Sequence, residues 1–373
     1  MRKRLEKMLF TLLLCFALLA LGIVLYLQQP KFGDLPAGAR LERIKSSQNY
    51  ADGQFQNLVP IPKREGRSSA SLWWEYLFKS KERLRPADSI PVMKTDLKAL
   101  DKSQDIVVWL GHSSYFLQLG GKRVLIDPVF SVYAAPVPFV NKAFPGTTNL
   151  YTAEDMPEID VLLVSHDHWE HLDYLAVTAL KPKIKAVICG LGVGAYFEQW
   201  GFAAESIHEA DWFTKLEMEH GFSVHVLPAR HYSSRMLSRN KTLWAGFAIV
   251  TPQHKVFISG DGGYGPHFKE IGEKFNGFDI VMLDNGQYDK NWPYVHMTPE
   301  EAVQAAEDLQ AKALLPGHVG KFTIANHPWN EPFQRITNAS QNKSYRLLTP
   351  IMGEPVELAN TQQVFSRWWE KMN

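Results

Sequence analysis

The residues best suited to chemistry in this 373-residue chain are three histidines, His166, His168 and His171, spaced at i, i+2 and i+5. They follow an apolar run, residues 159–164, that predicts a buried strand, so they enter a loop whose base that strand fixes. Such a loop can turn several imidazoles toward one point. Because neutral imidazole and carboxylate are preferred ligands of Zn²⁺, the segment indicates a metal site. The spacing alone is suggestive, since a lone histidine is more often structural.

The segments around this loop alternate short apolar runs with turns. One helix, residues 299–310, is predicted by Thr298 as its cap and Pro299 at its first position. A second helix is expected near residues 195–200, after a glycine-rich turn at 190–194 that lacks the rest of a dinucleotide-binding unit. The predicted strands are 106–110, 115–119, 124–126, 159–164, 186–189, 223–227, 244–250, 256–259, 280–283 and 313–315. This pattern suits two β-sheets flanked by helices.

The composition excludes some classes of protein. A net charge of +1 is unlike the basic excess of a general nucleic-acid binder, so no nucleic-acid partner is expected. The apolar fraction of 45% is that of a globular protein. The two cysteines, Cys15 and Cys189, lie in different apolar runs, and we predict no disulfide between them.

The N-terminus predicts a membrane anchor. Residues 9–27 carry no charge and are long enough to cross a bilayer as a helix, and Arg2, Lys3, Arg4 and Lys7 precede them. The positive-inside tendency then places the rest of the chain on the non-cytoplasmic side of the membrane. A cleaved signal peptide is the alternative, but its apolar region would be shorter and would end in small residues.

Several motifs in order make the chain resemble the metallo-β-lactamase superfamily, whose fingerprint is H-x-H-x-D-H after a strand. From about residue 105 to 335 it is most similar to the branch containing N-acylphosphatidylethanolamine-hydrolysing phospholipase D. Beside the histidine cluster, the motifs are WLGHSS at 109–114, DPVFS at 127–131, EADW at 209–212, SGDGGY at 259–264 and HMTPEEA at 296–302. The resemblance implies an α/β fold, a four-layer αββα sandwich with metals at one edge, here with an N-terminal transmembrane helix.

The resemblance also implies a ligand set, which comprises a first zinc on His166, His168 and His231, a second on Glu170, His171 and His318, and Asp261 bridging both. A bridging carboxylate can hold two metals close enough to share a hydroxide. The chain departs from the family at Glu170, because the fingerprint has Asp there and the extra methylene moves the carboxylate. We expect Glu170 to bind by a different rotamer, giving two zinc ions per chain, with one tight zinc as the alternative.

Other residues have expected roles beside the metals. His296 matches a family position near the substrate, where it would orient the phosphate or protonate the leaving group, and a structural cap is the alternative. Asp261, His296 and Glu170 are thus the predicted catalytic residues. Asp127 would orient ligand histidines, and His112 would support the sheet beside the site.

The implied function is that of a zinc-dependent phosphodiesterase of phospholipase D type, which hydrolyses N-acylphosphatidylethanolamine-like lipids beside the membrane. A lactone or amide hydrolase with the same site is one alternative, since the fold does not decide the bond. A non-catalytic, membrane-anchored metal-binding module is another. The expected partners are a phospholipid or another small substrate and the membrane. No feature of the sequence indicates an oligomeric state.

The chain is accordingly divided into four predicted parts. Residues 1–30 are the anchor, and residues 31–100 form an extension that packs on the main domain. Within that extension, residues 71–83 predict a short amphipathic helix, with Trp73, Trp74, Leu77 and Phe78 on its apolar side. Residues 101–345 form the hydrolase domain, and residues 346–373 form a C-terminal tail.

Overall fold

The computed structural model describes residues 2–62, 82–235 and 238–372, whose strands form two large sheets and one small one. The first large sheet contains β3 (Ile106–Gly111), β4 (Ser114–Leu119), β5 (Lys122–Ile126), β6 (Ile159–Val164), β7 (Ile184–Gly190), β8 (Ile207–Ala210) and β16 (Pro355–Glu357). The second contains β9 (Lys215–Glu217), β10 (Ser223–Leu227), β11 (Gly246–Val250), β12 (Lys255–Ile258), β13 (Ile280–Asp284), β14 (Ala313–Gly317) and β15 (Arg346–Leu347). Their strand orders are β16-β3-β4-β5-β6-β7-β8 and β15-β14-β13-β12-β11-β10-β9.

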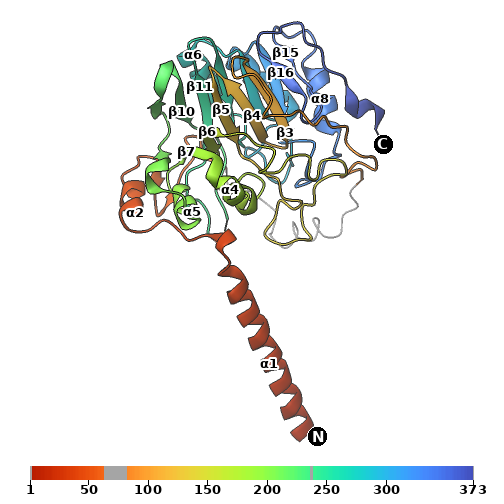
Figure 1. Cartoon of the computed structure of the whole chain (residues 1–373). Helices are drawn as coiled ribbons and strands as arrows, with labels where there is room; N and C mark the ends of the chain where they lie inside the picture. Colours follow the sequence, from red (N-terminus) through yellow and green to blue (C-terminus); the bar gives the residue numbers. More distant parts are fainter. Residues whose placement is uncertain (1, 63–81, 236–237, 373) are drawn as a thin grey trace.

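Successive residues of the central strands face different layers. Trp109 of β3 and Phe247 of β11 pack between the two sheets, whereas their neighbours Val108 and Ala248 pack against outer clusters. The outer clusters are completed on the first sheet by α4 (Tyr174–Leu180) and α5 (Gly194–Gln199), and on the second by α6 (His267–Phe275), α7 (Pro299–Asp308) and α8 (Glu331–Ala339). The predicted four-layer αββα sandwich is therefore confirmed (Figure 1).

Strand direction brings the candidate residues to one edge of the sandwich. In the second sheet β12, β13 and β14 are parallel, and β10 runs in the same direction because it is separated from β12 by the antiparallel β11. His231 follows β10, Asp261 follows β12 and His318 follows β14, so all three lie at the carboxyl ends of their strands. The loop after β6 meets them from the first sheet.

Most predicted elements are confirmed with small changes in their bounds. The helix predicted at 299–310 is α7, where Thr298 and Glu301 form a reciprocal capping box. The turn at 190–194 joins β7 to α5, as expected. Residues 346–373, predicted as a tail, contribute β15 and β16 to the two sheets. Residues 71–81 of the helix predicted at 71–83 lie outside the described part of the chain, and residues 82 and 83 are not helical. The division into four parts stays a prediction.

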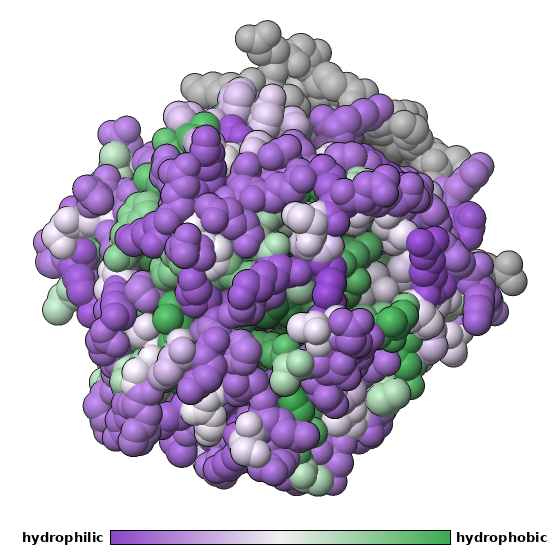
Figure 2. All heavy atoms as spheres, turned by 90° about the horizontal axis from the view of Figure 1, so that it is seen from above, coloured by the Kyte–Doolittle hydropathy of each residue, from purple (hydrophilic) through white to green (hydrophobic). Residues whose placement is uncertain are grey.

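The N-terminal helix α1 (Arg2–Leu27) projects from the domain with no buried residue (Figure 1). By length and composition it could cross a membrane, as an anchor or as a signal sequence. Where it ends, Tyr26 and Lys31 both donate hydrogen bonds to the carbonyl of Pro136, at 2.5 and 2.8 Å. The surface at the opposite end of the molecule is mostly hydrophilic (Figure 2).

Two further N-terminal elements lie against the domain, namely α2 (Gly38–Lys45) and the small sheet of β1 (Tyr50–Ala51) and β2 (Gln54–Phe55). Arg40 of α2 donates a hydrogen bond of 2.9 Å to the buried carboxylate of Glu209. The start of the extension is therefore tied to the first sheet.

Candidate metal centre

The loop of residues 165–173 turns its histidines inward directly after β6. The carbonyl of His168 accepts hydrogen bonds from the backbone N–H groups of His171 at 3.1 Å and of Leu172 at 2.8 Å, which closes a tight turn. The ring centroid of His166 consequently lies 4.4 Å from that of His168 and 4.2 Å from that of His171. Asp173 then caps the N-terminus of α4.

A first group of potential ligands consists of His166, His168, His231 and Asp261, whose ligand atoms all lie within 4.8 Å of one another. Nδ1 of His168 is 3.4 Å from Nε2 of His231. The Nε2 atoms of His166 and His231 are each 3.9 Å from Oδ2 of Asp261. Because ligands of a tetrahedral zinc ion lie roughly 3.3 Å apart, these separations are close to those around a bound ion.

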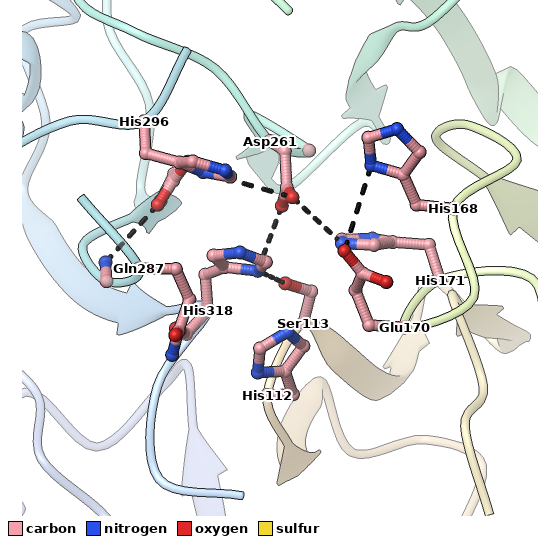
Figure 3. A network of polar contacts seen from close by, with 12 residues as sticks. His112, Ser113, His168, Glu170, His171, Asp261, Gln287, His296 and His318 are labelled. Atoms are coloured by element: carbon pink, nitrogen blue, oxygen red, sulfur yellow. Dashed lines mark hydrogen bonds and ion pairs between the residues drawn. The ribbon is translucent and has the colours of Figure 1, made fainter. Parts of the chain in front are cut away.

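Asp261 also faces a second group of potential ligands. Its Oδ2 lies 3.0 Å from Nε2 of His171, and its Oδ1 lies 3.1 Å from Nδ1 of His318. Glu170 forms a group of three with His171 and Asp261, whose ligand atoms also lie within 4.8 Å of one another, and its Oε1 is 3.7 Å from Nδ1 of His168. Figure 3 shows Asp261 joined by dashed lines to His171 and His318, with Glu170 rising from below toward His168. One carboxylate can therefore serve two neighbouring cations.

The unpartnered polar atoms of the centre fit a cation. Among the described residues, Nε2 of His166 and of His318 are buried without a hydrogen-bond partner, and the buried carboxylate oxygens of Asp261 face only the neighbouring histidine rings. Leaving such an atom unpaired costs about 1–3 kcal/mol. A divalent ion would satisfy several of them at once, and the imidazole and carboxylate donors are those that such an ion takes.

Burial sets the protonation of the first group. It lowers the pKa of His166, His168 and His231 well below the usual histidine value, and neighbouring histidines lower it further. These rings are neutral near pH 7, which is the form that binds metal. Burial alone would also lower the pKa of His171, but the carboxylate of Asp261 raises it well above its ordinary value. A cation at Nε2 would take the place of that proton.

Asp127 holds the metal loop from behind. Its Oδ1 accepts a hydrogen bond of 2.8 Å from the backbone N–H of Ser165, and its Oδ2 accepts from Ser165 Oγ at 2.5 Å and from His171 Nδ1 at 2.8 Å. Ser165 Oγ also lies 3.0 Å from Nδ1 of His166. Because Nδ1 of each histidine is engaged, Nε2 is left for the metal. This is the orienting role that the sequence predicted for Asp127.

We expect Asp127→Asn to lower metal affinity about 10- to 100-fold, because the amide can present an N–H group to the donors of Ser165 and His171. Competition with a chromophoric chelator measures the affinity. Asp160→Asn is the control, since Asp160 lies near the opposite end of β6 and pairs with Lys185. Equal affinities for Asp127→Asn and the wild-type chain would contradict the orienting role.

His296 lies at the rim of the centre, with its side chain 10% exposed. Its Nδ1 donates a hydrogen bond of 2.8 Å to Asp284, and the same atom is 4.0 Å from Oδ2 of Asp261. Its ring stacks on that of His318 at 4.8 Å. Burial alone would lower the pKa of His296, but Asp284 and Asp261 raise it. His296 is therefore held beside the potential ligands with its pKa raised.

The structure brings together every residue predicted for the site, namely His166, His168, Glu170, His171, His231, Asp261, His296 and His318. Asp284 was not among the residues predicted from the sequence, although it follows a predicted strand at the same sheet edge. Nor was Asn57, whose side chain bonds the carbonyl of His231 at 2.8 Å and its N–H at 3.0 Å. Asn57 lies in a segment without a recognisable pattern, so no signal could have found it.

Comparisons with known sequences agree with this geometry. The Beta-lactamase superfamily domain matches residues 122–319. An uncharacterized protein of Mycobacterium tuberculosis is 36% identical over 336 residues, which cover 87% of this chain and 88% of that protein. Outer membrane protein RomA of Klebsiella pneumoniae is 61% identical over 99 residues, 26% of this chain and 75% of that protein. N-acyl-phosphatidylethanolamine-hydrolyzing phospholipase D 1 of Caenorhabditis elegans is 30% identical over 266 residues, 66% of this chain and 74% of that enzyme.

Solved structures share the fold at low identity. A metallo hydrolase from the archaeon Ignicoccus hospitalis superposes with a TM-score of 0.51 and 20% identity, covering 68% of this chain and 97% of that one. Isothiocyanate hydrolase from Delia radicum gut bacteria gives a TM-score of 0.54 and 17% identity, covering 67% of this chain and 98% of that one.

Proposed function

Because the chain belongs to the metallo-β-lactamase superfamily, in a branch resembling N-acylphosphatidylethanolamine-hydrolysing phospholipase D, we propose that it is a zinc-dependent phosphodiesterase of phospholipase D type. One observation carries the proposal, which is that the buried Asp261 is shared by three overlapping groups of potential ligands. Two cations that share a carboxylate are suited to in-line attack on a phosphodiester. The family relationship itself supports a metal-dependent hydrolase, and the substrate and the metal are parts of the proposal.

The proposed ligands are His166, His168 and His231 for one zinc, Glu170, His171 and His318 for the other, and Asp261 for both. Bound zinc would supply an activated water and neutralise charge on the phosphoryl oxygens. The chain itself orients the ligand rings through Asp127 and Ser165 and supplies a proton at His296. With Nδ1 of His296 held by Asp284, the other ring nitrogen can donate to the leaving alkoxide or to a phosphoryl oxygen.

A cation near the centre supports an anionic substrate. The ring of Tyr232 packs against that of His168, with centroids 4.7 Å apart, and the guanidinium of Arg239 lies 4.1 Å from the centroid of Tyr232. The positive charge of Arg239 is close enough to lower the pKa of His168, after burial and the neighbouring histidines. The negative charge of a phosphodiester would be attracted by the positive charge of Arg239.

An apolar cavity beside the metal loop supports a lipid substrate. It measures about 820 Å³ and is lined by Tyr26 at the end of α1, by Val137 and Pro138, by Trp169 and by Leu175 of α4. In the sequence, Trp169 stands between two of the proposed metal ligands. A lipid whose headgroup reaches the metals could therefore place an acyl chain in this cavity, next to the point where α1 would leave a bilayer.

We expect Leu175→Glu to raise KM for a lipid substrate roughly tenfold, about 1.4 kcal/mol, because it puts a carboxylate against the acyl chain. A short, water-soluble phosphodiester should be cleaved at the wild-type rate. Val364→Glu is the matched control, since Leu175 and Val364 are both exposed, at 66% and 87%, and Val364 does not line the cavity. Equal effects of Leu175→Glu on both substrates would contradict acyl binding here.

We further propose that α1 is an uncleaved anchor that places the catalytic domain on the non-cytoplasmic side. The basic residues before its apolar part support this orientation, and an apolar helix that buries none of its residues against the domain supports the anchor. Phe139, 79% exposed beside the cavity-lining Pro138, would meet the membrane surface. A C-terminal alkaline phosphatase fusion should be active, because that reporter folds only outside the cytoplasm, and an inactive fusion that is made in full would reverse the orientation.

The test of the function uses the full chain in detergent micelles with zinc. Incubation with N-acylphosphatidylethanolamine should release N-acylethanolamine and phosphatidic acid, and His168→Ala should abolish the release. If the chain instead cleaved a lactone or an amide and left the lipid intact, it would be a hydrolase of another bond and not a phosphodiesterase. A chain that binds metal but cleaves none of these substrates would be a binding module.

A further inference from the structure

One buried histidine has no role in the centre described so far. His112 is fully buried, and neither of its ring nitrogens has a hydrogen-bond partner among the described residues. A histidine that only supported the sheet would normally bond a backbone carbonyl or a side chain, because an unpaired buried N–H group costs about 1–3 kcal/mol. The described residues around His112 therefore offer its ring no hydrogen-bond partner, which a purely structural histidine would be expected to have.

His112 lies beside two ligands of the proposed second cation. One ligand atom each of His112, His171 and His318 lie within 4.8 Å of one another. The ring centroid of His112 is 4.1 Å from that of His318 and 6.0 Å from that of His171. Figure 3 shows His112 below His318 and Ser113, whereas Glu170 lies to the right and its carboxylate reaches toward His168.

The backbone fixes His112 against His318. The N–H of His112 donates to the carbonyl of Val319, and the N–H of His318 donates to the carbonyl of His112, both at 3.1 Å. The indole of Trp109 donates to the same His112 carbonyl at 2.9 Å. His112 and His318 both have left-handed backbones, with φ of 54° and 58°. Such strain in a non-glycine residue persists where the surroundings impose it, and it commonly marks a functional site.

We propose that His112 is a ligand of the second metal ion, together with His171 and His318. This inference rests on the proposed two-cation centre. Three imidazoles form a familiar zinc site. The added donor would secure the ion on the side of His318, away from Glu170, which stands in place of the shorter Asp of the family. Zinc bound there would also take up a ring nitrogen of His112, which is otherwise left unpaired.

The test is the metal content of the full chain and of His112→Phe in detergent, with the affinity of each site measured by chelator competition. The variant keeps a buried ring but has no donor. We expect it to lose one of two zinc ions, or to bind the second at least about tenfold more weakly, with the first site unchanged. The absorption spectrum of the cobalt-substituted protein should also change, because the donor set changes.

His267→Phe is the matched control, since His267 is buried but belongs to no ligand group of the described residues, and it should keep both ions and the wild-type cobalt spectrum. If His112→Phe fails to fold by circular dichroism, His112→Gln is measured in the same way. Two ions of wild-type affinity and an unchanged spectrum in the folded variant would overturn the role of His112 and leave the centre intact. A wild-type chain that binds one ion would overturn this inference, and one that binds none would overturn the proposed function as well.

Discussion

Replacing Asp261 by alanine is expected to remove both metal ions and to lower kcat/KM by at least about a thousandfold, equivalent to about 4 kcal/mol. The carboxylate stands between the two ligand groups, 3.0 Å from Nε2 of His171 and 3.1 Å from Nδ1 of His318. It also lies 3.9 Å from Nε2 of His166 and of His231. Loss of this side chain would therefore remove a proposed ligand from both cations and leave the neighbouring histidines without its negative charge.

Metal analysis and steady-state kinetics on the same preparation measure this effect. Asp279→Ala is the control, because Asp279 is a partly exposed carboxylate just before β13 that pairs with Lys312. It should keep two ions and wild-type activity. An Asp261→Ala protein that still held two ions at wild-type affinity would show that the carboxylate does not bridge them.

The second large effect is expected for His296→Gln, which should lower kcat about 10²- to 10⁴-fold while both metal ions are retained. His296 holds its proton because Asp284 and Asp261 raise its pKa against the effect of burial. If His296 is the proposed proton donor, the active form is the protonated one. Activity should fall as the pH rises through this pKa, and the alkaline limb of the pH profile should be absent in the variant.

Asp284→Asn tests the source of the raised pKa. Removing the carboxylate removes the main cause that raises the His296 pKa, so the alkaline limb should move to lower pH. His296, Asp261 and His318 also form a group of potential ligands, so His296 could bind metal instead of donating a proton. The metal content of the His296 variant distinguishes these two roles. Loss of a metal ion in His296→Gln would make His296 a ligand and not a proton donor.

Local sequence determined the strands and the residue types of the site. Central strands such as β6 and β12 are buried on both faces, so each is a run of mostly apolar residues. Such a run can be recognised in the sequence without knowing which strands lie beside it. The histidine cluster after β6 and Asp261 after β12 are tied to those runs by a few residues. Their chemistry could therefore be predicted before the strands were paired.

Only the tertiary structure decided which distant groups meet. Asn57 bonds the backbone of His231, and His112 bonds the backbone of the loop that carries His318. The partners in each pair are far apart in the chain, so no periodic pattern of residues predicts that they meet. The strands β15 and β16 have two and three residues, too few for a pattern, and exist because β14 and β3 offer them unpaired edges. The cavity between the end of α1 and Trp169 likewise forms only when both are in place. Such features depend on hydrogen bonds and packing between segments far apart in the chain, and local residue patterns do not encode these contacts.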